Sequence, residues 1–340
     1  MHGHKVVLIT GGCGAIGAVV VNWLKKEYPT TLFVNLDALT YCGKKEHIEP
    51  PLHNYKFYYG SITDASLVSY ILETEQPTLL IHLAAETHVD QSFGNSFRFT
   101  HVNVMGTHTL LECAKGYGKL RMFLHMSTDE VYGSVCNKET CTETSMFAPS
   151  NPYSASKAAG EMICHAYQKS FALPITIMRC NNAISPFQHE EKLIPRCVET
   201  IIQREKLAGA KVEDNLPKIP IHGSGMSKRT FIHAADIATA IDTIVAKGKD
   251  GSIYNIGTGA HMEHTVMDVV RTVVKLMVPT IDASDDDNIN NYIEHVPDRA
   301  FQDYRYSIDS SALRSLGWTD KISFDHAIED IIEHRRHIRA

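Results

Sequence analysis

A hydroxyl, two adjacent carboxyl groups, a phenol and an ammonium group fall close together in the middle of the chain. They belong to Thr128, Asp129, Glu130, Tyr153 and Lys157. Tyr153 and Lys157 are four residues apart, so on a helix they share one face. An ammonium group beside a phenol favours the phenolate and lowers the pKa of the tyrosine. Such a phenolate can take a proton from an alcohol while hydride leaves the same carbon.

The carboxyl pair of Asp129 and Glu130 indicates a second acid–base step, because alcohol oxidation alone does not need it. Neighbouring carboxyl groups in a partly desolvated site tend to have separated pKa values, so one can act as an acid and the other as a base. Taken alone, a Ser-Thr-Asp is usually a turn or a helix cap, and Tyr-x-x-x-Lys is a common spacing. The two patterns favour a catalytic function here because they occur together and follow a nucleotide-binding pattern in the sequence.

The elements around these residues predict how they are positioned. The apolar run 122–126 is typical of a buried strand, and it ends where the polar residues begin. Ligands bind at the carboxyl ends of the strands in a doubly wound sheet, so residues 128–130 are expected at the mouth of a crevice. Tyr153 is expected to begin a helix that runs to about residue 171. Residues 134–150 are polar and are predicted to form a loop over the site.

A nucleotide-binding pattern occupies the N-terminus. The apolar run 5–9 predicts a buried parallel strand, and Gly11, Gly14 and Gly17 follow it before a helical pattern begins. Glycines let the backbone approach a pyrophosphate that rests on the helix N-terminus. Asp37 ends the next strand, twenty residues past Gly17, where an acidic residue binds the adenosine ribose hydroxyls. Its charge would repel a 2′-phosphate, so the pattern favours NAD over NADP.

The alternation of strand and helix patterns predicts an α/β protein. We expect a Rossmann-type doubly wound parallel sheet with a smaller mixed α/β C-terminal substrate lobe. Residues 1–185 are predicted to form a NAD-binding domain that carries the catalytic residues, and residues 186–340 mainly a substrate-binding lobe. Residues 219–257 are expected to return in part to the Rossmann sheet. The acidic and amide-rich stretch 284–291 is predicted to be a solvated loop.

Composition limits the class of protein. The chain has 340 residues, 44% of them hydrophobic and 21% charged, with a formal net charge of −6. The chain has no long basic run, so nucleic acid and anionic membranes are not expected as partners. Neither a signal peptide nor a membrane-spanning stretch of about 20 apolar residues is predicted. The eight cysteines show no framework spacing, so reduced thiols and a cytoplasmic location are expected. Cys136 and Cys141 could pair but are expected to be reduced. His261 and His264 lack further ligands nearby, so no metal site is predicted.

On these residues the chain resembles the extended short-chain dehydrogenase/reductase family, and more narrowly the nucleoside-diphosphate-glucose 4,6-dehydratases, over nearly its whole length. The glycine motif and Tyr-x-x-x-Lys define only the superfamily. The Thr-Asp-Glu within 127–133 is the specific part, because sister 4-epimerases typically lack the carboxyl pair. Agreement extends to four further stretches, which are 39–41 (L-T-Y), 82–90 (H-L-A-A-E-T-H-V-D), 191–195 (E-K-L-I-P) and 316–318 (L-G-W).

The resemblance implies a role for each matched residue. Tyr153 is the base that oxidises the sugar at C4, and Lys157 tunes it. Thr128 binds the sugar hydroxyl. Asp129 protonates the departing C6 hydroxyl, and Glu130 removes the C5 proton. Hydride then returns to C6, so NAD is regenerated within the cycle and the product is a 4-keto-6-deoxy sugar, which a separate enzyme would convert to rhamnose or another deoxysugar.

The resemblance also implies two sets of binding residues. The cofactor set is Gly11, Gly14, Ala15, Ile16, Gly17, Asp37, Thr40, Ser61, Ile62, Leu83, Ala84, Ala85, Thr87, Tyr153 and Lys157. The substrate set is Thr87, Thr128, Asn182, Lys192, Leu193, Pro220, His222, Arg229, Arg299 and Gln302. Arg229 and Arg299 are expected to clamp the diphosphate, because arginine forms bidentate contacts to phosphate. Ser61, Ser185 and His222 depart from the family pattern without removing a catalytic group.

The nucleotide of the substrate is predicted from residues 301–303. Thymidine-linked bacterial enzymes usually carry Gly-His-Asp there, whereas Phe301-Gln302-Asp303 is closer to the Phe-Asn-Asp of UDP-glucose dehydratases. Val266 also stands where the thymidine group tends to have asparagine. UDP-glucose is therefore favoured over dTDP-glucose.

Two rival functions and an assembly state complete the expectations. A UDP-sugar 4-epimerase would share every motif except the carboxyl pair, and a non-catalytic NAD-binding regulator would not need Tyr153 or Lys157. Family resemblance predicts a homodimer that pairs through helices near 97–117 and 153–171, although both helices could simply cover the sheet.

Overall fold

A parallel sheet of seven strands forms the centre of the computed structural model, which describes residues 1–135, 139–209, 216–298 and 301–339. All neighbouring strands in it run parallel. The strands, in their order across the sheet, are β10 (Ile253–Ile256), β6 (Ile175–Cys180), β5 (Met122–Thr128), β4 (Leu79–His82), β1 (Val6–Thr10), β2 (Leu32–Asp37) and β3 (Tyr55–Tyr59). The chain starts in the middle and winds to both edges, so the predicted doubly wound fold is confirmed.

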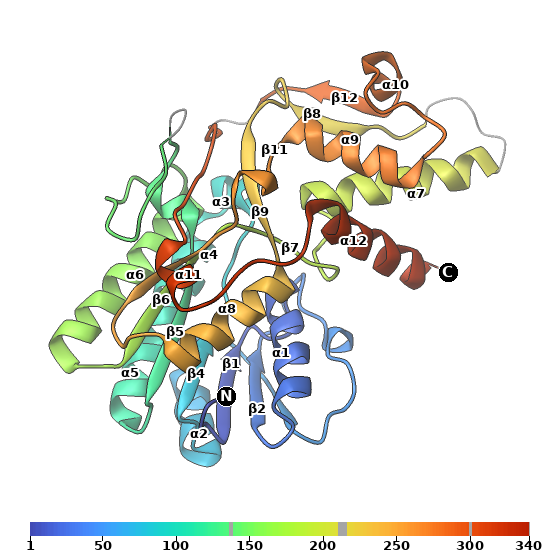
Figure 1. Cartoon of the computed structure of the whole chain (residues 1–340). Helices are drawn as coiled ribbons and strands as arrows, with labels where there is room; N and C mark the ends of the chain where they lie inside the picture. The colour runs from blue at the N-terminus through green and yellow to red at the C-terminus, as the bar shows by residue number, and fades with distance from the viewer. Residues whose placement is uncertain (136–138, 210–215, 299–300, 340) are drawn as a thin grey trace.

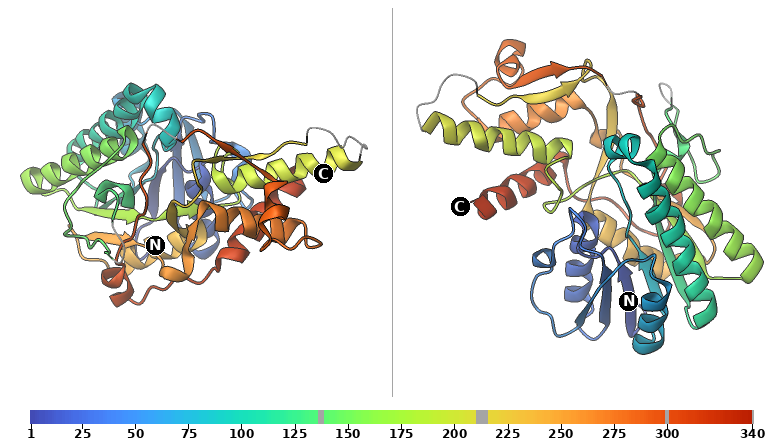
Figure 2. Two further views of the ribbon diagram at one scale, coloured as in Figure 1. Left: turned by 90° about the horizontal axis from the view of Figure 1, so that it is seen from above. Right: turned by 180° about the vertical axis from the view of Figure 1, so that it is seen from behind.

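Helices cover both faces of this sheet (Figure 1). α1 (Ala15–Glu27) and α8 (Ala234–Lys247) pack together on one face. The other face carries α2 (Ala65–Glu75), α5 (Thr107–Tyr117) and α6 (Pro152–Phe171), with α5 and α6 side by side in the right-hand view of Figure 2. Among the described helices, none combines the length and the apolar character that crossing a lipid bilayer requires.

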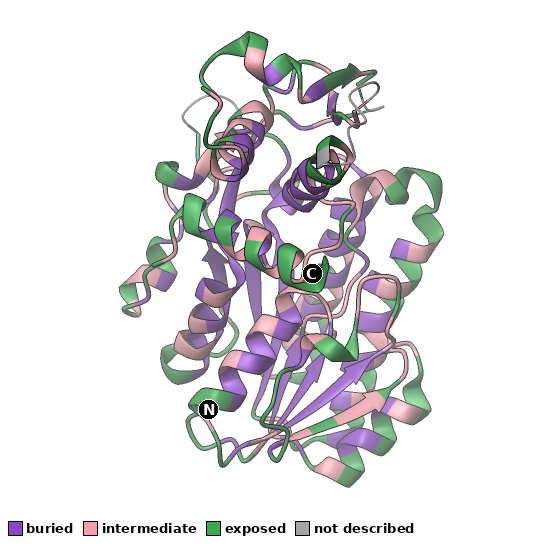
Figure 3. Cartoon of the chain, turned by 90° about the vertical axis from the view of Figure 1, so that its right-hand side faces the viewer, coloured by how far each residue is buried: buried purple, intermediate pink, exposed green. Residues whose placement is uncertain are grey.

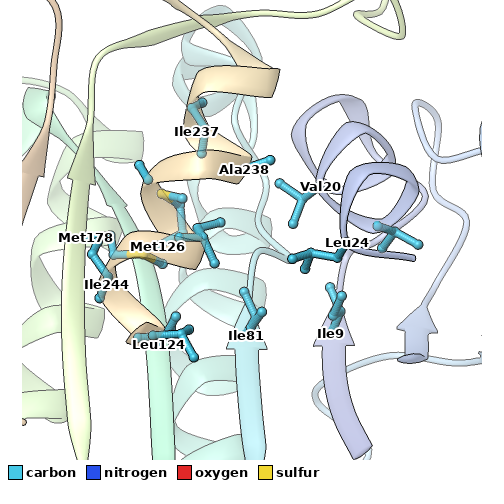
Figure 4. Packing of buried hydrophobic residues seen from close by; sticks show 14 of the residues in the cluster. Ile9, Val20, Leu24, Ile81, Leu124, Met126, Met178, Ile237, Ala238 and Ile244 are labelled. Carbon is cyan, nitrogen blue, oxygen red and sulfur yellow. The ribbon is translucent and has the colours of Figure 1, made fainter. Parts of the chain in front are cut away.

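The alternation of side chains along each strand divides the core between the two faces. In β1, Ile9 packs with Val20 and Leu24 of α1, whereas the preceding residue, Leu8, belongs to the cluster on the opposite face. Figure 4 shows the first cluster, in which Met126 of β5 lies with residues of α1 and α8. The inner strands are buried on both faces, as Figure 3 shows, which explains their continuous apolar runs, whereas the edge strand β3 is partly exposed.

A second, smaller lobe has its own core. Its strands are β7 (Asn182–Ile184), β8 (Ile219–His222), β9 (Lys228–His233), β11 (Glu263–Thr265) and β12 (Ile293–Val296), in one mixed sheet of order β11-β9-β7 and one parallel pair β12-β8. Its helices are α7 (Leu193–Gly209), α9 (Val266–Met277), α10 (Asp286–Asn290) and α12 (Phe324–Arg339). The boundary at residue 185 stays a prediction. α8 and β10 lie with the main sheet although they follow strands of the smaller lobe.

Two elements differ from the sequence predictions. The stretch 284–291 was predicted to be a loop, but it contains the short helix α10, whose first turn is capped by the Asp285 carboxylate accepting from the Asp287 N–H at 2.9 Å. The single helix predicted over 97–117 is built from α4 (Ser96–Phe99), a π-helical segment η2 (Thr100–Gly106) and α5. Such π segments often mark functional sites, and Asn103 of η2 is buried and donates 2.9 Å to the Ser156 hydroxyl on α6.

The remaining elements are short connections. They are η1 (Lys45–His47), α3 (Val89–Gly94), η3 (Asp129–Tyr132), η4 (Ala260–Met262) and α11 (Ser311–Ser315). Of these, η3 directly follows β5 and carries the carboxyl pair.

Candidate active site

The central strand β5 delivers three polar side chains to the carboxyl edge of the sheet. Thr128 ends the strand, and Asp129 and Glu130 begin η3. The Thr128 hydroxyl accepts the Glu130 N–H at 3.3 Å and so fixes the turn between strand and helix. All three residues are buried, which makes their environment one of low dielectric.

Asp129 is buried, and both oxygens of its carboxyl group accept hydrogen bonds. Its side chain is 99% buried (1% exposed), and Oδ2 accepts from the Asn181 amide at 2.7 Å while Oδ1 accepts from the Thr128 hydroxyl at 3.2 Å. Burial and the neighbouring Glu130 carboxylate raise the pKa of Asp129 to about 7, against the lowering effect of the Asn181 hydrogen bond. A carboxyl group with this pKa is substantially protonated near neutrality, as a general acid must be.

Glu130 faces a different set of partners. Its Oε2 atom lies 3.3 Å from the Asn151 amide nitrogen and 3.4 Å from the Tyr306 hydroxyl. Burial raises the pKa of Glu130, and the cationic Arg229 opposes that effect. Asn151 is also the N-cap of α6, accepting the Ser154 N–H at 2.9 Å, so one amide positions both the helix and the carboxyl group.

Tyr153 and Lys157 lie on the first turns of α6 and are both buried. The Lys157 ammonium donates 2.7 Å to the Met126 carbonyl oxygen of β5. Burial lowers the pKa of Lys157 to about 8. The prediction that Lys157 lowers the pKa of Tyr153 does not hold in this structure, because burial, followed by the nearby Glu130 charge, raises the pKa of Tyr153.

A buried ion pair supports the turn below the carboxyl groups. Arg179 of β6 is 2% exposed and forms a bidentate pair with Glu161 of α6, in which Nε donates to Oε1 at 3.2 Å and Nη2 donates to Oε2 at 2.7 Å. The same guanidinium donates 2.7 Å to the Tyr132 hydroxyl at the end of η3. Removing one partner of such a buried pair typically costs about 3–5 kcal/mol. The pair therefore fixes β6, α6 and η3 relative to one another.

One cavity runs along the carboxyl edge of β1, β2, β4 and β5 and is lined by every residue of the predicted cofactor set. Gly11 has a φ of +74°, and a Cβ there would lie 2.6 Å from the backbone of Ala84. A Cβ on Gly17 would collide with the carbonyl oxygen of Gly11. The glycines thus allow the first turn of α1 to lie against the strand ends, leaving the helix N-terminus facing the cavity.

Asp37 lies at the far end of this cavity from the carboxyl pair, on β2. Its carboxylate accepts from the Cys13 N–H at 2.8 Å and from the Leu39 N–H at 2.8 Å. These bonds join the glycine loop to the segment that contains Thr40 and Tyr41. The two hydrogen bonds fix the Asp37 carboxylate among the residues that line the cavity.

A second cavity opens between the carboxyl pair and the smaller lobe. It is lined by Thr87, Asn182, Lys192, Leu193, Pro220, His222, Arg229 and Gln302 of the predicted substrate set. Thr128 lines only the first cavity, and Arg299 lies outside the described residues. Glu130 and Asn182 line both cavities, so the two meet at Glu130, whereas Asp129 is not among the lining residues of either. The assigned roles of these residues stay predictions.

Several residues at the site were not predicted from the sequence. Asn181 and Asn151 hydrogen-bond the carboxyl pair, and Tyr306 and Asp303 approach Glu130 from the smaller lobe. The only signal for Asn151 was its place before Pro152, a pattern typical of a helix start. Nothing in the local sequence of residues 303–306 indicates contact with residue 130.

A family model described as GDP-mannose 4,6 dehydratase matches residues 8–331. The chain belongs to this family. The match is continuous and covers the glycine motif, the carboxyl pair and most of the second lobe of this chain.

Named relatives of this family member are of two kinds. A trifunctional UDP-glucose 4,6-dehydratase/UDP-4-keto-6-deoxy-D-glucose 3,5-epimerase/UDP-4-keto-L-rhamnose-reductase of Arabidopsis thaliana is 39% identical, over 97% of this chain and 46% of the plant protein. The chain therefore spans about half the length of that relative. A dTDP-D-glucose 4,6-dehydratase of Mus musculus is 38% identical, over 97% of this chain and 88% of the mouse protein. The two identities do not separate UDP-linked from dTDP-linked sugars.

Solved structures of this fold include a dTDP-glucose 4,6-dehydratase from Streptomyces venezuelae with NAD bound. It has a TM-score of 0.85 and 34% identity, covering 98% of both chains. A UDP-glucose 4-epimerase from Thermotoga maritima, with UDP-glucose, has a TM-score of 0.84 and 25% identity, covering 98% of this chain and 100% of the epimerase. Backbone similarity is therefore nearly equal for the two kinds of enzyme, and the side chains at the carboxyl edge must discriminate between them.

Proposed function

We propose that this protein catalyses the NAD-dependent dehydration of a nucleotide-linked glucose to the 4-keto-6-deoxy sugar. The observation that carries the proposal is the buried Asp129–Glu130 pair, of which Glu130 lines both cavities while Tyr153 lines the first. A 4-epimerase needs oxidation and reduction at one carbon only and has no use for the pair. Loss of water needs a proton donor for the leaving hydroxyl and a base for the neighbouring carbon.

The first cavity fits NAD. Its glycine loop leaves room for a pyrophosphate at the N-terminus of α1, and the Asp37 carboxylate suits two ribose hydroxyls and would repel a 2′-phosphate. When bound, NAD would accept hydride from C4, and its reduced form would return hydride to C6. The resemblance to NAD-containing dehydratases supports this assignment.

The protein side chains then divide the proton transfers among them. Tyr153 accepts the C4 hydroxyl proton as its phenolate, which the positive charge of Lys157 on the same helix face favours. Once C4 is a ketone, the C5 hydrogen is acidic, and Glu130 removes it. Asp129, whose pKa of about 7 keeps it substantially protonated, donates to the leaving C6 hydroxyl. Water leaves and a C5–C6 double bond forms, which hydride and a proton then saturate.

UDP-glucose is the substrate that we propose over dTDP-glucose. Phe301 and Val266 line the second cavity, as the sequence comparison with UDP-glucose dehydratases requires. Phe301 is half-exposed at the rim and offers an aromatic face on which a base can stack. Asn182 Nδ2 and Gln302 Oε1 line the same cavity, and both are buried without a hydrogen-bond partner among the described residues. Such groups suit a polyhydroxylated ligand.

Incubation of the purified protein with UDP-glucose and, separately, dTDP-glucose tests the reaction and the nucleotide together by mass spectrometry. We expect the loss of one water from both, faster from UDP-glucose. A preference for dTDP-glucose would overturn the nucleotide assignment and keep the chemistry. An epimerised sugar of unchanged mass would favour the 4-epimerase, and retained NAD with no turnover would favour a regulator. The Glu130→Gln protein serves as the control for contaminating dehydratases.

We also propose a homodimer that pairs through α4, η2, α5 and α6. Phe97 on α4 is 86% exposed, and Met105 on η2 and Met162 on α6 are half-exposed, and these three elements pack against one another. Large exposed apolar side chains that cluster in this way are typical of an interface.

Sedimentation analysis of Met162→Glu checks the dimer. We expect the wild type to sediment as a dimer and the variant as a monomer, because a buried unpaired charge opposes association. Leu52→Glu, which changes an exposed leucine away from these helices, is the matched control and should remain dimeric. A monomeric wild type would show that the helices only cover the sheet.

A further inference from the structure

A phenol and a third carboxyl group reach Glu130 from the C-terminal part of the chain. They belong to Tyr306 and Asp303, both buried, on the segment between β12 and α11. This segment lies against the loop that follows η3, where the Val135 N–H donates 3.0 Å to the Arg305 carbonyl oxygen. The backbone contact holds Tyr306 above η3.

The Tyr306 hydroxyl lies between two carboxyl groups but has one proton to give. Its oxygen is 2.5 Å from Asp303 Oδ2 and 3.4 Å from Glu130 Oε2. A hydrogen bond from a hydroxyl to a carboxylate is short because the charge strengthens it. The proton of Tyr306 therefore points at Asp303. The Ser150 hydroxyl also hydrogen-bonds Oδ2 of Asp303 and anchors that carboxylate.

Glu130 consequently faces the lone pairs of the Tyr306 oxygen rather than its proton. Lone pairs cannot stabilise a carboxylate, but they can accept a hydrogen bond from a protonated carboxyl group. The arrangement favours the protonated form of Glu130, which is the form that follows proton removal from C5.

We infer that Asp303 is a positioning residue for Glu130 and that it acts through Tyr306. By holding the Tyr306 proton, Asp303 strengthens Glu130 as a base. The inference rests on the proposed function, in which Glu130 takes the C5 proton. The C5–H electron pair then forms the C5–C6 double bond as the C6–O bond breaks. Asp129 protonates the leaving hydroxide to water, and the Glu130 carboxyl group donates to the Tyr306 oxygen.

The other groups around Glu130 act in both directions. Arg229 and Lys192 lower the pKa of Glu130, as does the Asn151 amide, whereas Asp303 raises it. The titratable and charged neighbours are Asp129 on η3, Tyr153 on α6, Arg229 on β9, Lys192 before α7, and Asp303 and Tyr306. The charge of Asp303 thus opposes the lowering of the Glu130 pKa by Arg229 and Lys192, which belong to the predicted substrate set.

The variant Asp303→Asn tests the inference, because it should affect removal of the C5 proton and leave the oxidation at C4 unchanged. The amide no longer holds the phenolic proton by charge, so Tyr306 can donate to Glu130 and lower its pKa. We expect the acid limb of C5 hydrogen exchange, followed by NMR in deuterated buffer, to move about one pH unit lower. Above that limb, the exchange rate should fall about 10-fold, because a weaker base removes the proton more slowly. The initial formation of reduced nicotinamide should keep its wild-type rate.

Two further variants separate this role from a structural one. Thr140→Val removes a 3.1 Å hydrogen bond to Ser307 between the same two segments and should leave the exchange profile unchanged. Asp303→Glu keeps the charge and should restore much of the exchange rate. The inference is overturned if Asp303→Asn leaves the acid limb in place, or if it slows nicotinamide reduction and C5 exchange equally. Absence of exchange in the wild type would instead contradict the proposed function.

Discussion

Replacing Glu130 with glutamine is expected to lower the rate of water elimination by about 10²- to 10⁴-fold, the usual contribution of a general base. Glutamine keeps the shape of the side chain and cannot accept the C5 proton. Tyr153 is untouched, so oxidation at C4 should proceed and reduced nicotinamide should accumulate in place of product. Near-ultraviolet absorbance follows the nicotinamide, and mass spectrometry follows the loss of water.

A substitution of Asp129 and a control variant extend this test. Asp129→Asn should also block elimination, and it should abolish the alkaline limb near pH 7 that the wild-type elimination step is expected to show, because Asp129 must be protonated to donate. Glu139→Gln changes an exposed carboxylate in the loop after η3 and should behave as wild type. If water is still lost at the wild-type rate after Glu130→Gln, the assignment of the base is wrong.

Replacing Tyr153 with phenylalanine is expected to stop the reaction one step earlier, with a rate loss also of about 10²- to 10⁴-fold. The variant lacks the phenolic oxygen that, as the phenolate, accepts the C4 hydroxyl proton, so neither reduced nicotinamide nor the dehydrated sugar should form. NAD should remain bound, because the glycine loop and Asp37 are unchanged. Stopped-flow absorbance after mixing with substrate measures the first step directly.

The contrast between the two active-site variants is the decisive part of the comparison. Glu130→Gln should accumulate reduced nicotinamide, and Tyr153→Phe should not. Tyr167→Phe alters a hydroxyl farther along α6, where it bonds His108 at 2.9 Å, and controls for changes in the helix itself. Rapid reduction of the nicotinamide in Tyr153→Phe would transfer the role of base to another group.

The sequence alone determined the parts of this protein that depend on local pattern. The period of apolar residues predicted the strands of the main sheet, because strands buried on both faces need continuous apolar runs. Gly11, Gly17 and Asp37 predicted the first cavity, because their spacing within one strand–helix–strand unit fixes their relative positions. The four-residue spacing of Tyr153 and Lys157 placed both on one helix face for the same reason.

Only the tertiary structure decided how the chemical groups are tuned. Asp303 and Tyr306 lie more than 170 positions from Glu130 in the chain, and only the packing of the smaller lobe brings them to it. The sequence predicted a lowered pKa for Tyr153, whereas burial, followed by the charge of Glu130, raises it, and Lys157 donates its hydrogen bond to the Met126 carbonyl oxygen. Local spacing fixes which side chains share an element, whereas burial and long-range contacts set their charge. Which side chains share an element could therefore be predicted from sequence, but the environment that sets their proton affinities could not.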